Sequence, residues 1–196
     1  MNFDAWRFYL RGRLWSLLRQ PRRAEAEYRE ALRHAPDNAR LWHTLGFLLA
    51  SQHLFREATP CLERATDITP RDSDLWFNLG FIRQKLGDTD GAIAAFERSV
   101  AERATQDRAW FGLGMLHASA GRHERARDAL TQAAELQPMN GEAWYQLGMA
   151  HHTLHDTDRV KEIALHLNRF DRLRTRQLIR DTQRSDLAWM VQDLLV

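Results

Sequence analysis

The chain has 196 residues, of which 44% are hydrophobic and 28% charged, and its formal net charge is +2. These proportions are ordinary for a globular or repeat protein, and they exclude a collagen-like chain, a long disordered segment and a disulfide-rich scaffold. A single cysteine, Cys61, cannot form an intramolecular disulfide, which fits a reducing compartment.

The N-terminal stretch, residues 3–18, combines aromatic and leucine side chains with arginines at short intervals. It lacks the unbroken apolar run of ~7–15 residues that a secretory signal requires, so we expect a cytoplasmic protein. Charge is distributed unevenly, because residues 1–23 carry a net +5 and residues 169–184 a net +4, which leaves −7 on the rest. The chain has 26 arginines and two lysines, a bias typical of a GC-rich bacterial genome.

A motif that begins with tryptophan recurs every 34 residues through the middle of the chain. It reads WHTLG at 42–46, WFNLG at 76–80, WFGLG at 110–114 and WYQLG at 144–148. Counting back one period from Gly46 reaches Gly12, so five glycines keep the same spacing. A fixed period of this length predicts tandem helical hairpins that stack on one another.

This pattern resembles the tetratricopeptide repeat (TPR), a 34-residue unit with W-x₂-L-G-x₂-Y, a later A-x₃-F and a closing proline. Pro36, Pro70 and Pro138 close three units, and Ala104 takes the corresponding place in another. The resemblance implies an all-α fold, a right-handed α-solenoid of TPR helical hairpins with C-terminal capping helices. We expect five units at about 5–38, 39–72, 73–106, 107–140 and 141–174, the last degenerate, and a helical cap at 175–196.

Helical patterns continue beyond the repeats. Residues 172–183 form one predicted helix, and residues 185–196 form another, with an apolar stripe of Leu187, Met190 and Leu194. Two interpretations of the last helix stay open. It covers the exposed end of the array, or it lies in a binding groove of its own molecule or of a neighbour.

Two positions in the first helix of each unit, one after the tryptophan place and one after the glycine, lie four residues apart and share a helix face. The resemblance implies that this face lines a concave binding surface. We therefore expect a partner-binding surface formed by Tyr9, His43, Phe47, Phe77, Asn78, Phe81, Phe111, Met115, Tyr145 and Met149.

These aromatic and methionine side chains exceed what packing requires, because the tryptophans and leucines of the motif already fill the predicted core. A contiguous apolar surface usually marks an interaction site, and methionine adapts to varied partners. We expect a protein-interaction scaffold or assembly factor, not an enzyme, that binds an apolar helix or peptide of another protein. In the alternative interpretation, neighbouring first helices bury this surface against each other.

Other chemistry finds little support, and we expect no cofactor, no metal and no nucleic-acid partner. His151 and His155 have a spacing that can hold a metal, but His155 falls near a helix end, so a structural role is favoured. Asn78 can hydrogen-bond the backbone of an extended ligand. Some TPR proteins bind the C-terminal carboxylate of a peptide with lysine, asparagine and arginine side chains on this surface, but the expected lysine and arginine are absent here. The basic, amphipathic N-terminal helix supports an alternative function, a scaffold that self-associates or contacts a membrane peripherally.

Overall fold

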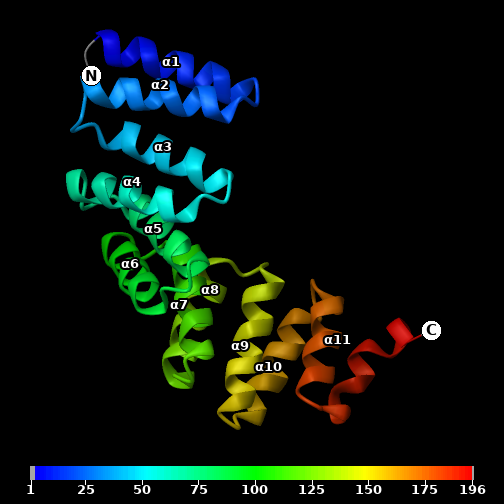
Figure 1. Cartoon of the computed structure of the whole chain (residues 1–196). Coiled ribbons are helices and arrows are strands. Elements are labelled where there is room, and N and C mark those ends of the chain that lie inside the picture. The colour runs from blue at the N-terminus through cyan, green and yellow to red at the C-terminus, as the bar shows by residue number, and fades with distance from the viewer. Residues whose placement is uncertain (1–2, 196) are drawn as a thin grey trace. The chain divides into compact units, whose positions relative to one another are not determined.

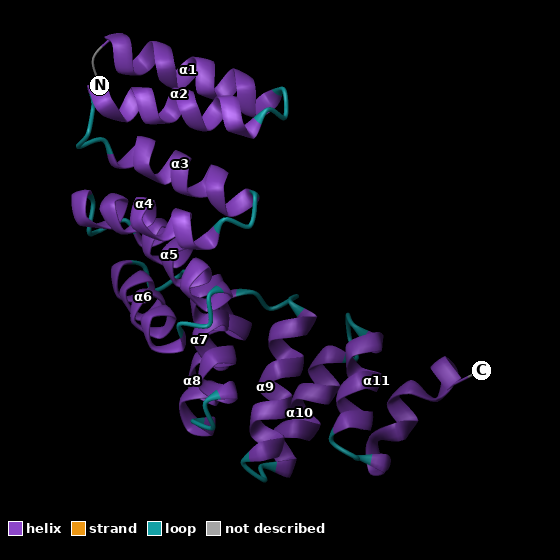
Figure 2. Cartoon of the chain, viewed as in Figure 1, coloured by secondary structure: helices purple, strands orange, loops and turns teal. Residues whose placement is uncertain are grey.

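The structure is a computed structural model that describes residues 3–195 of the chain and the side chains of residues 3–192. These residues form eleven α-helices and a final 3₁₀ helix (Figure 1). Short loops join the helices, and no strand occurs among the described residues, which confirms the all-α prediction (Figure 2). The elements are α1 (Phe3–Leu17), α2 (Pro21–His34), α3 (Ala39–Ser51), α4 (Phe55–Ile68), α5 (Ser73–Lys85), α6 (Thr89–Glu102), α7 (Asp107–Ser119), α8 (His123–Leu136), α9 (Gly141–Thr153), α10 (Thr157–Leu167), α11 (Arg172–Asp181) and η1 (Ser185–Leu195).

The period of the sequence reappears in the helix starts. Four first helices, α3, α5, α7 and α9, begin 34 residues apart, and so do all five second helices, α2, α4, α6, α8 and α10. Side chains just before the helices determine several of these starts, because they bind amide groups that have no partner within the helix. Asn38 Oδ1 accepts a hydrogen bond from the Leu41 amide at 3.2 Å, and Asn140 Oδ1 accepts one from Ala143 at 3.2 Å.

The chain forms two compact units, Met1–Arg103 and Ala104–Val196, which we describe separately. The first unit contains the hairpins α1–α2, α3–α4 and α5–α6, and the second contains α7–α8 and α9–α10, followed by α11 and η1. Each unit has its own apolar core. Buried leucines dominate both cores: Leu41, Leu45, Leu49, Leu62 and Leu79 in the first, and Leu130, Leu147, Leu167, Leu178 and Leu187 in the second.

In four hairpins a glycine of the first helix faces a large side chain of the second helix, sixteen positions later. A Cβ added at Gly80, for example, would lie 2.7 Å from the Phe96 ring. A side chain does not fit in this space, so the glycine allows the two helix axes to approach and the ring to pack on bare backbone. The four pairs are Gly12–Tyr28, Gly46–Leu62, Gly80–Phe96 and Gly114–Leu130.

The last hairpin departs from this rule and uses α11 instead. The position sixteen residues after Gly148 holds Ala164, which is too small to fill the space. Leu178 of α11 takes that space, since its Cδ1 would lie 2.8 Å from a Cβ at Gly148 and its side chain is fully buried. The boundary expected between repeats and cap therefore falls inside α11, which begins at Arg172 and completes the core of the degenerate hairpin.

The repeated tryptophans are half-buried and pack at the edges of the two cores, whereas the leucines of the motif are buried as predicted. Each indole Nε1–H donates a hydrogen bond to the carbonyl six residues earlier, in the loop before its helix. The Ala104 carbonyl accepts from Trp110 at 2.8 Å, as the Pro70 carbonyl does from Trp76, because the bond needs only a backbone carbonyl. The four bonds are Trp42–Pro36, Trp76–Pro70, Trp110–Ala104 and Trp144–Pro138.

The final segment is less regular than the sequence predicts. A 3₁₀ helix replaces the expected α-helix, and it is interrupted at Val191, whose φ of −134° and ψ of 18° are not helical. Leu187 and Met190 are buried in the second core, and η1 packs against α11. The third residue of the predicted stripe, Leu194, has a side chain outside the described residues. The described contacts make η1 a cap on α11.

Candidate functional site

We call the surface formed by the positions after the tryptophan and glycine places the inner face. In the first unit α1, α3 and α5 contribute to it. Tyr9 is buried, and His43 and Phe77 are half-buried. Phe47 of α3 and Phe81 of α5 are 67% and 41% exposed. These two rings, at equivalent positions of successive first helices, therefore provide the large apolar surface of the inner face of this unit.

A cleft of about 460 Å³ opens beside Phe47, between α1 and α3. Ser16 lies in its wall, where its hydroxyl donates to the Gly12 carbonyl at 3.0 Å and lies 3.2 Å from the Tyr28 hydroxyl. Arg13 is the one charged residue of the lining, so the cleft suits an apolar or neutral group. The lining residues are Tyr9, Arg13, Ser16, Leu17, Tyr28, Thr44, Phe47, Leu48 and Ser51.

His43 and Asn78 form a polar contact between α3 and α5. Asn78 Nδ2 lies 3.0 Å from His43 Nε2, a distance at which the amide donates to a neutral imidazole. Burial lowers the pKa of His43, although Asp72 and Asp74 act in the opposite direction, so the imidazole is neutral at pH 7. Asn78 thus has a partner within the molecule, whereas the sequence suggested a role toward the backbone of a ligand.

The two phenylalanines of α5 have different surroundings. Phe77 packs against Phe96 of α6, with 5.8 Å between ring centroids, and so contributes to the packing of its own hairpin. Phe81, one helical turn later, has the Lys85 ammonium 5.2 Å from its ring centroid and keeps 41% of its surface exposed. A partner can therefore contact Phe81 without displacing a core residue.

The inner face of the second unit carries Phe111, Met115, Tyr145 and Met149. Tyr145 is buried because α11 lies against it. Its hydroxyl donates to Asp181 Oδ2 at 2.8 Å, and the Arg174 guanidinium lies 5.5 Å from its ring centroid. Burial and then the bond to Asp181 raise the pKa of Tyr145. Phe111 and Met149 pack at the edge of the second core and stay half-buried, as does Met115.

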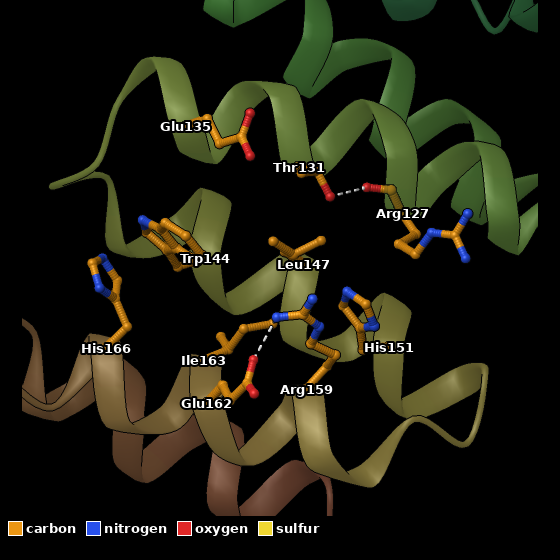
Figure 3. A pocket seen from close by; sticks show the side chains of 10 residues that line it. All are labelled: Arg127, Thr131, Glu135, Trp144, Leu147, His151, Arg159, Glu162, Ile163 and His166. Atoms are coloured by element: carbon orange, nitrogen blue, oxygen red, sulfur yellow. Dashed lines mark hydrogen bonds and ion pairs between the residues drawn. The ribbon is translucent and has the colours of Figure 1, made fainter.

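A second cleft, of about 450 Å³, lies in the second unit among α8, α9 and α10 (Figure 3). Trp144, Leu147 and His151 line it, so it opens on a different face of α9 from Tyr145. Figure 3 shows its charged wall, where Arg159 Nη1 and Glu162 Oε2 form an ion pair at 2.5 Å. No motif of the sequence indicates this cleft, because its lining comes from three helices whose residues share no repeat position. The lining residues are Arg127, Thr131, Glu135, Trp144, Leu147, His151, Arg159, Glu162, Ile163 and His166.

His151, Asp156 and Cys61 carry side chains that can bind metals or react, and in the structure these side chains make contacts within the protein or are buried. His151 Nδ1 lies 3.1 Å from Asp156 Oδ2, and Asp156 also caps α10 by accepting from the Arg159 amide at 3.2 Å. Among the side chains of residues 3–192, no three His, Cys, Asp or Glu groups gather as metal ligands would. Burial raises the pKa of Cys61, which keeps the thiol protonated near pH 7.

A sequence profile of the tetratricopeptide repeat matches residues 18–79 and 84–148. The chain belongs to the tetratricopeptide repeat family. The matched segments contain three of the four tryptophan motifs completely and the motif at 76–80 as far as Leu79. Stacked TPR hairpins generally serve as scaffolds for protein–protein interaction, because they create extended binding surfaces.

Solved structures of other TPR proteins share this fold. A crystal structure of MamA aligns with a TM-score of 0.77 and 18% identity, over 96% of this chain and 98% of that chain. YrrB, described as a TPR protein with an unusual peptide-binding site, aligns at 0.72 and 21% identity, over 98% and 93%. Pseudomonas aeruginosa PilF aligns at 0.74 and 21% identity, over 91% and 82%. No curated protein sequence matches the chain.

Proposed function

We propose that this TPR protein is a non-enzymatic interaction scaffold or assembly factor that binds an apolar helix or peptide of another protein on the inner face of its first unit. Phe47 and Phe81 are the anchors. The exposure of these two rings at equivalent positions of α3 and α5 carries the proposal. The first core is complete without either ring, so a partner that buries them gains apolar contact that the fold does not use.

One partner segment can contact both anchors, because α3 and α5 are successive first helices and are close enough for the contact between His43 and Asn78. An apolar face of an α-helix presents side chains at positions i and i+7, about 10.5 Å apart. Two such side chains would cover the two rings, and a third would enter the cleft beside Phe47.

The neighbouring groups disfavour a positively charged segment, because Arg13 lines the cleft and the Lys85 ammonium lies 5.2 Å from the centroid of the Phe81 ring. The imidazole of His43 is neutral, and Thr44 and Ser51 contribute hydroxyl groups to the cleft. On the second unit, taken by itself, the half-buried Met115 and Met149 offer a separate surface that adapts to different side chains. We place the protein in the cytoplasm of a bacterium, in keeping with its single cysteine and its arginine bias.

The test compares partner capture by two double variants that carry equal numbers of substitutions in the first unit. Phe47→Ser with Phe81→Ser removes both anchors, and Leu54→Ser with Leu86→Ser replaces two exposed side chains outside the inner face. We expect the first variant to bind its partner about 30-fold more weakly or worse, which is the loss that truncating hot-spot residues causes. Its helical CD spectrum should not change. The control variant keeps the partner. Equal capture by both variants would refute the proposal.

A second candidate function is structural: a scaffold that self-associates or lies on a membrane through α1. The specific observation in its favour is the outer side of α1, where Phe3, Trp6 and Leu17 are exposed. Of these three residues only Leu17 also lines the cleft beside Phe47, so a substitution at Trp6 tests this candidate function without changing the inner face.

A further inference from the structure

The outer side of α1 carries a continuous apolar stripe. Phe3, Trp6, Leu10, Leu14 and Leu17 follow spacings of three and four residues, which place them within about 80° of the helix circumference. All five are exposed, whereas the opposite side of α1 packs in the first core. Their exposed area is about 500 Å², comparable with the largest apolar patch on a typical monomer, which is often functional. We call these five residues the outer stripe.

The repeat itself does not require this stripe. The equivalents of Leu14 in α3 and α5 are Leu48 and Ile82, both buried, so an apolar residue is expected there. The equivalents of Trp6, Leu10 and Leu17 are polar in both helices. They are Arg40, Thr44 and Ser51 in α3, and Asp74, Asn78 and Lys85 in α5. The outer stripe is therefore a property of α1 and exceeds the apolar surface by which one hairpin contacts the next.

Positive charge borders the outer stripe on both edges. At 100° per residue, Arg7 and Arg11 flank one edge and Arg13 flanks the other. Asp4 lies 3.6 Å from Arg7, and Glu27 lies 2.7 Å from Arg11. These two ion pairs do not neutralise the positive charge of the first hairpin. Residues 3–34 contain eight arginines and four acidic residues, a net +4.

This charge pattern excludes the simplest pairing with a second copy of the chain. In an antiparallel pair of α1 helices each edge meets the same edge of the partner, so Arg7 and Arg11 face their own counterparts. In a parallel pair the Arg13 edge meets the Arg7 edge. Both arrangements set arginine against arginine, which is destabilising.

An anionic lipid surface complements the same pattern. A helix that lies in the interface inserts its apolar side ~5–10 Å, keeps its arginines at the level of the headgroups and places tryptophan at the boundary. No helix within residues 3–195 is long and apolar enough to cross a bilayer. We propose that the outer stripe docks the protein onto an anionic membrane. The inference rests on the second candidate function and does not use the rings of Phe47 and Phe81, while Arg13 and Leu17 also line the cleft beside Phe47.

The test is flotation of the full chain with vesicles of phosphatidylserine and phosphatidylcholine, compared with vesicles of phosphatidylcholine alone. We expect binding to the anionic vesicles that weakens at high salt. Trp6→Glu with Leu17→Glu should abolish it, whereas Leu173→Glu, at a site 72% exposed on α11, should not. Each arginine near an anionic surface contributes about fivefold in affinity, so Arg7→Gln with Arg13→Gln should weaken binding about 25-fold while preserving the outer stripe.

Light scattering of the same samples separates the two ways in which the inference can fail. Equal flotation with both kinds of vesicle, or none, overturns it. If the protein then forms a concentration-dependent oligomer that Trp6→Glu with Leu17→Glu disrupts, α1 binds a second copy and the second candidate function survives. A monomer that ignores both vesicles refutes the inference and that candidate function together.

Discussion

Replacing Leu178 with alanine tests how the last hairpin is completed. This side chain is fully buried and lies against the backbone at Gly148, where the other hairpins place a large residue of their own second helix. Truncating a buried leucine costs about 2–5 kcal/mol, from lost burial and from the cavity left behind. We expect about 3 kcal/mol, because Gly148 and Ala164 have no side chains that could move into the space. The midpoint of thermal unfolding should fall by about 6–12 °C.

A second substitution makes this reasoning specific. Ala164→Leu in the Leu178→Ala protein restores a large residue sixteen positions after Gly148, as in the other four hairpins, and should recover about half of the lost stability. The same Ala164→Leu change alone should destabilise the protein by about 1–3 kcal/mol, because Leu178 already fills the site.

Urea and thermal unfolding followed by CD measure these effects. Leu173→Ala, on the same helix but 72% exposed, is the matched control and should change stability by less than about 0.5 kcal/mol. Equal losses from Leu173→Ala and Leu178→Ala, or a failure of Ala164→Leu to rescue, would show that α11 does not substitute for the missing residue.

Three further outcomes are expected. Gly80→Val should cost at least about 2 kcal/mol in urea unfolding, since its Cβ would lie 2.7 Å from the Phe96 ring. Trp110→Phe removes the donor to the Ala104 carbonyl and should cost about 1 kcal/mol in the same assay; an unchanged midpoint would show that the bond adds nothing. Burial holds the pKa of His43 below its usual 6.5, so as pH falls the unfolded chain takes up this proton first. Stability should therefore decline as the pH falls through about 6.5, and the decline should be smaller in His43→Gln; identical pH profiles would contradict the assignment.

The sequence predicted the repeat architecture well because its information there is local and repeated. Tryptophan, leucine and glycine return at one spacing, and residues such as Asn38 and Asn140 mark helix starts through bonds to amides three residues away. Each helix can therefore be placed from its own residues, and period 34 then determines which helices pair.

Contacts that depend on distant residues could not be predicted in the same way. The tryptophans look like core residues, but Trp76 and Trp110 are half-buried because their indoles reach loop carbonyls. Tyr145 looks like a surface residue of the inner face, but α11, which follows the end of the period, covers it through Asp181 and Arg174. No repeat pattern in the sequence indicates where α11 packs.

The candidate site was predicted in outline only. Helical spacing brings the residues of the inner face together, yet it does not distinguish Phe47, which is open to solvent, from Phe77, which packs on Phe96. The two rings occupy different places of the repeat: Phe77 follows the tryptophan and packs on the second helix of its own hairpin, whereas Phe47 follows the glycine and stays exposed.

Site-specific photo-crosslinking in living cells tests most directly whether the inner face binds a partner. A photoreactive phenylalanine analogue replaces either Phe47 or, as a control of nearly equal exposure, Leu173. We predict that position 47 yields a discrete adduct with an apolar segment of another protein, that adding Phe81→Ser removes it, and that position 173 yields none. The same adducts from both positions, or no adduct from position 47, would contradict the account.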